Sequence, residues 1–128
     1  MKTASDIQTY LLELELPYEE PREGTWILRE LDGLDNLIVM IAGPVLVFRM
    51  KLMDVPHHQR EELFRTLLEL NATEMMHGAY GVEGDNVVIC DALELENLDY
   101  NEFAATIDDI MLAVASHHGR LAKYREAA

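Results

Sequence analysis

The sequence from residue 86 to residue 114, NVVICDALELENLDYNEFAATIDDIMLAV, carries most of the information about the fold. Its first part, Asn86 to Leu95, is rich in β-branched and aliphatic residues and predicts a strand. Asp99 is the expected N-cap of a helix, and Glu102 follows three residues later as in a capping box. The predicted helix places its apolar residues on one face: Phe103, Ile107, Ile110, Met111, Val114 and Leu121.

The segment before this strand adds a hairpin and a second helix. A strand near Ala79 to Val82 is predicted to turn at Gly84 into the strand that starts at Asn86. Upstream, Asp54 and Pro56 are expected to open an amphipathic helix. Its predicted core stripe consists of Leu63, Phe64, Leu67, Leu68 and Leu70. Residues 73–77 either extend this helix or form a loop.

The N-terminal half predicts one helix and three strands. Ser5 is the expected cap of the first helix, whose apolar residues are Ile7, Tyr10, Leu11 and Leu14. Pro17 and Pro21 predict a polar loop that runs through Gly24. Turns at Asp32-Gly33 and Gly43-Pro44 separate the predicted strands, which are Thr25–Leu31, Asn36–Ala42 and Val45–Met53. The order α-β-β-β-α-β-β-α predicts an α+β fold with an antiparallel sheet and flanking helices, as one domain over residues 1–128.

Alternation along the predicted strands separates the two faces of the sheet. On the third strand Leu46, Phe48, Met50 and Leu52 face one way, and Arg49 and Lys51 face the other. The middle strand is apolar on both faces from Leu37 to Ile41. One of these faces should meet the core, and the other must also be covered by something.

The composition limits the partners that this chain can have. The 24 acidic residues outnumber the 10 basic ones and give a net charge of −14, which argues against binding to nucleic acid or to an anionic membrane. This charge serves solubility or selects a basic partner. The single cysteine excludes an intrachain disulfide and suits a reducing cytosol. The polar start of the sequence does not resemble a signal peptide, so we expect a cytoplasmic protein.

Several histidines are candidates for metal or catalytic sites. His58 and Glu62 would lie one helical turn apart if both were helical, yet a third metal ligand is not evident. His77 beside Met75-Met76 suggests a soft-metal site or gap-filling methionines. His117-His118 suits the end of the last helix, where His118 extends the apolar stripe. We predict no bound metal and no cofactor.

The cysteine and the nearby carboxylates offer little catalytic chemistry. Cys90 is expected to be a buried, unreactive thiol, because its sequence neighbours are apolar or acidic. Asp91, Glu94 and Glu96 are expected to be solvated rather than paired for acid–base work. The sequence therefore favours a protein that binds over an enzyme.

Several segments resemble the YbjN-type proteins, which are related to the type III secretion chaperones of the Tir class. The resemblance is carried by the element order and by the segments LLELN (67–71), GAYGV (78–82), NVVI (86–89), LEL (93–95) and NLDYNEF (97–103). It implies a chaperone-like fold, an acidic cytosolic protein, frequent homodimers and peptide binding without catalysis. It implies no catalytic residue.

We therefore predict a homodimeric, chaperone-like module that binds a protein or an extended peptide segment. A regulatory or structural domain within a larger assembly is the alternative. Two alternatives remain for Trp26 and for the face with Ile38 and Met40, which belong either to the core or to an exposed binding surface. The dimer contact is expected either on this face or on the second helix together with the hairpin near Tyr80. The predicted peptide-binding or dimer surface consists of Trp26, Ile38, Met40, Val45, Val47, Tyr80 and Val88.

Overall fold

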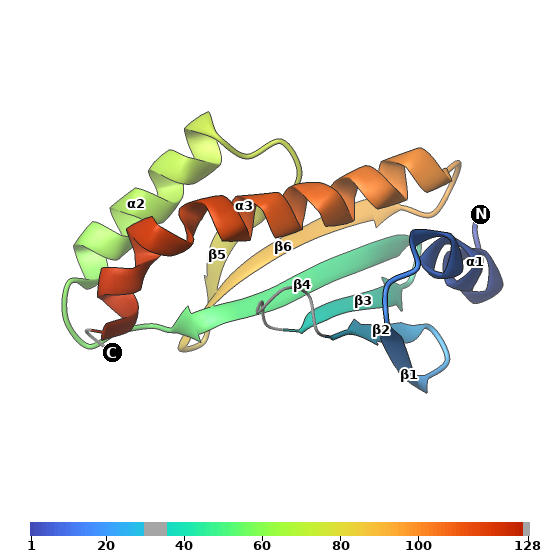
Figure 1. Cartoon of the computed structure of the whole chain (residues 1–128), viewed down its shortest axis with the longest axis horizontal. Coiled ribbons are helices and arrows are strands. Elements are labelled where there is room, and N and C mark those ends of the chain that lie inside the picture. The colour runs from blue at the N-terminus through green and yellow to red at the C-terminus, as the bar shows by residue number, and fades with distance from the viewer. Residues whose placement is uncertain (30–35, 127–128) are drawn as a thin grey trace.

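The computed structural model describes residues 1–29 and 36–126, and the elements in these ranges follow the order α-β-β-β-β-α-β-β-α (Figure 1). The first half contains α1 (Ala4–Leu14), β1 (Tyr18–Arg22), β2 (Thr25–Leu28), β3 (Leu37–Ala42) and β4 (Val45–Asp54). The second half contains α2 (Arg60–Thr73), β5 (Ala79–Glu83), β6 (Asn86–Glu94) and α3 (Tyr100–Glu126).

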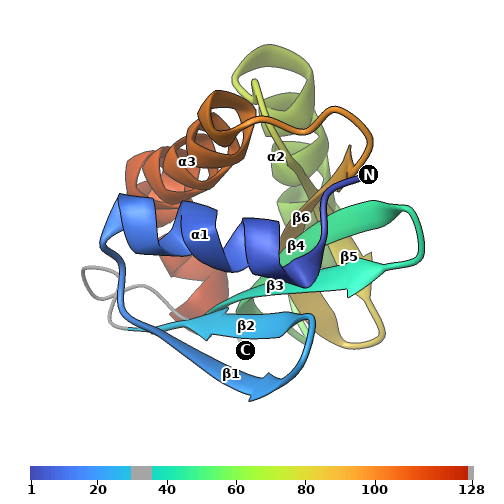
Figure 2. The ribbon, with the colours of Figure 1, turned by 90° about the vertical axis from the view of Figure 1, so that its right-hand side faces the viewer.

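The six strands form one sheet in the order β1-β2-β3-β4-β6-β5, and each neighbouring pair is antiparallel. The three helices lie on the same side of this sheet (Figure 2). The predicted α+β class with an antiparallel sheet and flanking helices is confirmed. We call the side under the helices the covered face and the opposite side the open face.

The hydrophobic core lies between the covered face and the helices. From α3, Phe103 and Ile107 are fully buried in the same cluster as Leu46, Phe48 and Met50 of β4, and the ring centroids of Phe48 and Phe103 lie 5.9 Å apart. At one end of the sheet, α1 contributes Ile7 and Leu11, whose side chains are also fully buried. At the other end, the buried residues of α2 are Leu63, Leu67 and Leu70.

The helix starts agree with the sequence at α3 and differ at α1 and α2. Asp99 caps α3 as predicted, since the Glu102 backbone N–H donates to Asp99 Oδ1 at 2.8 Å. For α1 the cap is Thr3 rather than Ser5, and the Thr3 backbone N–H donates to the Asp6 carboxylate at 2.8 Å. The start of α2 lies at Arg60 and not near Asp54, because β4 continues through Asp54.

The sequence prediction missed the edge strand β1 and placed a loop there. Pro21 lacks an N–H group, but an edge strand tolerates proline because one side of its backbone has no partner strand. The ladder with β2 is irregular between Glu19 and Arg22, which indicates a bulge. The predicted strand Thr25–Leu31 ends at Leu28, while its last two residues and the Asp32-Gly33 turn lie outside the described residues.

The opposite edge of the sheet is tied to α2 by one side chain. Asn71 near the end of α2 donates from Nδ2 to the Tyr80 carbonyl at 3.0 Å and accepts from the Tyr80 N–H at 2.7 Å. Just before β5, Gly78 has a φ of +81°, and a Cβ there would lie 3.3 Å from the Cys90 carbonyl oxygen. Together these residues fix how the chain passes from α2 into β5.

Candidate functional site

The open face carries a group of apolar side chains from β3 and β4. The register pairs Ile38 with Arg49, Met40 with Val47 and Ala42 with Val45. Since side chains alternate along a strand, Ile38, Met40, Val45 and Val47 point away from the covered face. Ile38 is 39% exposed, and the other three are partly exposed.

Charged residues continue the open face toward the other end of β4. Arg49 forms an ion pair with Glu83 of β5 at 2.7 Å, and Lys51 pairs with Asp54 at the same distance. These pairs are largely exposed and contribute little to stability. The open face is thus apolar near the β3–β4 turn and charged farther along β4.

Three of the seven predicted surface residues do not join this apolar group. Trp26 pairs with Val39 on the covered face and is fully buried there. Tyr80 pairs with Ile89 and is also buried under the helices. The register places Val88 opposite Lys51 on the open face, yet only 5% of it is exposed. Trp26 therefore belongs to the core, one of the two alternatives that the sequence left open, and neither Trp26 nor Tyr80 is exposed in this chain.

Cys90 also lies on the open face, which corrects the expectation of a buried thiol. It is only partly buried, and its register partner on β4 is Arg49. The neighbours across the sheet therefore include a cation, whereas the neighbours in sequence are apolar or acidic.

The outer surface of α2 exposes apolar residues that the sequence prediction had placed in the core. Leu68 is 67% exposed and Phe64 is partly exposed. They line a shallow groove together with Glu61, Arg65, Glu69 and Ala72. The helix buries Leu63, Leu67 and Leu70 at spacings of four and three, so Phe64 and Leu68 fall one position outside that stripe.

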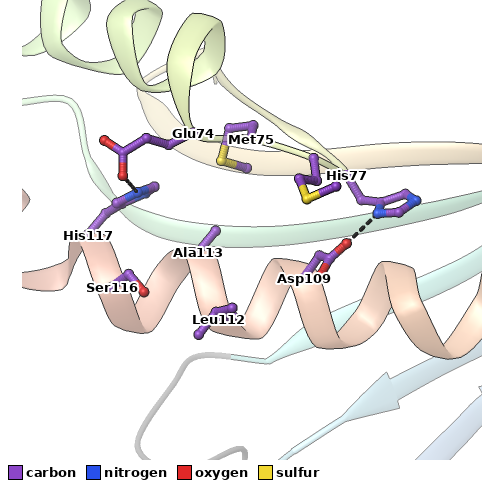
Figure 3. A pocket seen from close by; sticks show the side chains of 9 residues that line it. Glu74, Met75, His77, Asp109, Leu112, Ala113, Ser116 and His117 are labelled. Carbon is purple, nitrogen blue, oxygen red and sulfur yellow. Dashed lines mark hydrogen bonds and ion pairs between the residues drawn. The ribbon is translucent and has the colours of Figure 1, made fainter.

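A hollow of about 170 Å³ lies between the segment 74–77 and α3 (Figure 3). His77 and Met75 from the segment reach toward Asp109 and Ala113 of α3. The His77 ring contacts the Asp109 carboxylate through Nδ1. In Figure 3 the Glu74 carboxylate meets the His117 ring at the other end of the hollow, where Nε2 lies 3.4 Å from Glu74 Oε1.

His117 continues this contact into the core. Its Nδ1 lies 2.6 Å from the Tyr80 hydroxyl, and only 4% of His117 is exposed. Because a carboxylate only accepts, we assign the ring proton to Nε2 and the donor role at Nδ1 to the Tyr80 O–H group. Burial raises the pKa of Tyr80 to about 12, and the negative charge of Glu74 adds to this shift. The predicted roles of the two histidines are reversed, since His117 joins the buried stripe and His118 is exposed.

The described residues offer no metal centre. No group of three or more His, Cys, Asp or Glu side chains in residues 1–29 and 36–126 is arranged to hold a metal ion. His58 precedes α2, so His58 and Glu62 do not share one turn of a helix. Among the described helices, none combines the length and apolarity that crossing a membrane requires.

Comparison with known proteins identifies the family and the fold. The CesT_Tir_1 family profile matches residues 1–127. No curated protein matches significantly. The solved structure of YbjN from E. coli is similar with a TM-score of 0.69 and 16% identity, covering 93% of each chain.

Two complexes from type III secretion also contain a similar fold. A chain of the heterodimeric ExoU–SpcU complex of Pseudomonas aeruginosa has a TM-score of 0.71 and 17% identity, covering 95% of this chain and 99% of that one. The structure of the Yersinia pestis chaperone SycH with a stable fragment of YscM2 has a TM-score of 0.62 and 15% identity, covering 88% and 97%. At these identities the likeness concerns the fold.

Proposed function

Because the chain belongs to the CesT_Tir_1 family of type III secretion chaperones, we propose that it is a non-catalytic, chaperone-like module. In this proposal the protein forms a homodimer in the cytoplasm and binds an extended segment of another protein. The fold that it shares with SycH, which was solved with a fragment of YscM2, supports a protein partner.

The observation that carries this proposal is the apolar part of the open face. Ile38, Met40, Val45 and Val47 form two neighbouring rows of side chains on β3 and β4, and no described helix lies over them (Figure 2). Such surface is unfavourable in water and gains free energy when a partner buries it. An extended segment that crosses these rows would place alternate side chains on them.

The charge of the chain defines the preferred segment. With a net charge of −14, the protein attracts segments whose apolar residues are flanked by Lys or Arg. Screening by salt should weaken this attraction, since the Debye length is only about 8 Å at physiological ionic strength.

The outer surface of α2 is the proposed contact between two copies. Leu68 and Phe64 form its apolar centre, and Arg65 lies between Glu61 and Glu69 along the helix, with an exposed ion pair to Glu69 at 2.9 Å that a second copy could exchange for a contact across the interface. Two such helices related by a twofold axis would bring opposite charges together around the apolar centre. This arrangement leaves the open face of each copy available to a client.

Light scattering together with capture from a lysate of the native host tests both parts. The double substitution Met40→Asp with Val47→Asp should remove client capture without unfolding the protein, and it should leave the dimer intact. Leu68→Asp should instead give a monomer, whereas Leu12→Asp, at an exposed position of α1, should have no effect.

Two results would contradict the proposal. A wild-type protein that is monomeric at micromolar concentration would remove the homodimer. Unchanged client capture by a folded Met40→Asp, Val47→Asp variant would remove the assignment of the open face.

A further inference from the structure

The hollow between residues 74–77 and α3 lies on the helix side of the sheet, away from the open face (Figure 3). It is lined by Met75, Ala113 and Leu112, with carboxylates at Glu74 and Asp109. Its volume of about 170 Å³ is similar to that of an engineered cavity of about 150 Å³ that binds benzene. One bulky apolar side chain would therefore fit.

Exposed apolar side chains surround the hollow. Met76 is 86% exposed and Leu112 is 65% exposed, and both belong to its lining. Methionine side chains adapt their shape to a guest because they are unbranched and flexible. Two large apolar side chains beside an unfilled hollow form the arrangement in which a partner anchors a single residue.

The lining contains two carboxylates, Glu74 and Asp109, beside the polar side chains of His77, Ser116 and His117. Glu74 is contacted by the His117 ring at Oε1 and by Arg120 at Oε2, each at 3.4 Å. The His77 ring contacts Asp109 Oδ2. These contacts hold both carboxylates in place at the edges of the hollow, where each keeps the capacity to accept a further hydrogen bond.

We propose that this hollow is a second protein-binding site, which takes one bulky apolar side chain of a partner segment that carries Lys or Arg beside that residue. The apolar side chain fills the space between Met75 and Ala113 and is covered by Met76 and Leu112. The neighbouring cation pairs with Asp109 or Glu74. The site does not depend on the open face or on the homodimer, because it uses neither β3 and β4 nor the outer surface of α2.

A short peptide and methionine methyl NMR test this proposal. The probe is a nine-residue peptide with a central Leu between two Lys residues in a Gly/Ser background. Its titration into protein labelled at the methionine methyl groups should shift the Met75 and Met76 signals and leave the Met40 signal in place. Since Met40 lies on the open face, its signal separates this site from the one in the proposed function.

Matched peptides and protein variants test whether binding requires both the apolar side chain and the neighbouring Lys residues of the peptide. Replacing the central Leu of the peptide by Ser, or both Lys residues by Glu, should abolish the shifts. Leu112→Gln should weaken binding about fivefold or more through lost apolar contact, whereas Leu12→Gln, at a similarly exposed position on α1, should not. Ala113→Trp should fill the hollow and block the peptide, and Ala115→Trp, at an exposed position of α3 outside the lining, should leave binding unchanged.

Three results would overturn the proposal. The first is the absence of any Met75 or Met76 shift with the Leu–Lys peptide. The second is equal binding by the Leu112→Gln and Leu12→Gln variants. The third is a change in oligomeric state caused by Leu112→Gln, which would assign this surface to a second copy of the chain instead of a basic partner.

Discussion

The two faces of the sheet differ more in what covers them than in the residues that compose them. Along β4, Leu46, Phe48 and Met50 of the covered face are fully buried, whereas Val45 and Val47 of the open face keep part of their surface in water. The first group stabilises the fold by burial within this chain. The second group gains little from folding alone and is available for contact with another molecule.

The largest expected difference between the faces concerns the free energy of unfolding. Ile107→Ala, on the helix above the covered face, should lower it by about 2–5 kcal/mol because Ile107 is fully buried. Ile38→Ala on the open face should lower it by less than about 1 kcal/mol, as is usual for surface substitutions. Chemical denaturation of both variants provides the measurement. Equal shifts of the two midpoints would contradict the distinction between the faces.

Alkaline pH should lower the free energy of unfolding through Tyr80, which is buried on the covered face. The pKa of Tyr80 is raised by burial from 10.0 to about 12, so the folded state holds this proton more tightly than the unfolded state. The associated stability is complete below pH 10 and is lost as the pH rises toward about 12, by about 2 kcal/mol. Denaturation curves of the wild type and of Tyr80→Phe provide the comparison, measured from about pH 8, below the window in which this stability is lost, to about pH 11.5, within it. An equally steep decline in both proteins would assign the effect to other groups.

Removing the cap of α3, the helix that packs on the covered face, should lower the free energy of unfolding by a smaller amount. Asp99→Ala removes the acceptor of the Glu102 N–H and should cost about 1 kcal/mol. Asp108→Ala, at an exposed position within the same helix, is the matched control because it removes the same charge without removing the cap. Thermal unfolding should separate the two variants, and equal melting temperatures would contradict the role of the cap.

The smallest expected difference between the two faces concerns the labelling rate of a thiol placed on each of them. Cys90 on the open face should react with a thiol reagent in the native state, more slowly than in urea but to completion, because it is only partly buried. Cys90→Ser combined with Ile89→Cys moves the thiol to the fully buried neighbouring position on the covered face. Labelling should then depend on opening of the fold. Equal native labelling rates at the two positions would show that the open face is not more accessible.

The sequence predicts the element types well, because long periodic patterns and caps are local signals. The cap at Asp99 forms as predicted, and the predicted stripe is buried except at Met111, which is only partly buried. The strand β1 was missed because Pro21 and its acidic neighbours resemble a loop, and edge pairing is a property of the whole sheet.

The candidate surface could be predicted only in part. The sequence indicated that β3 is apolar on both faces but left open whether Ile38 and Met40 face the core, and the register places both on the open face. It could not show that Trp26 and Tyr80 lie beneath the helices, because that depends on which face of the sheet the helices pack against. The hollow near His77 joins residues 32 positions apart, so no local pattern indicates the contact between His77 and Asp109.

The side chain of Asn71 also bears on edge-to-edge association between copies of the sheet. By occupying both backbone groups of Tyr80, it takes the place that a further strand would use at that edge of the sheet. At the other edge, Pro21 and the bulge near Glu19 interrupt the row of N–H donors. Exposed strand edges are templates for pairing with another chain, so both features make extension of the sheet by a second copy less favourable. The amide of Asn71 thus acts as a local guard against edge-to-edge pairing at β5.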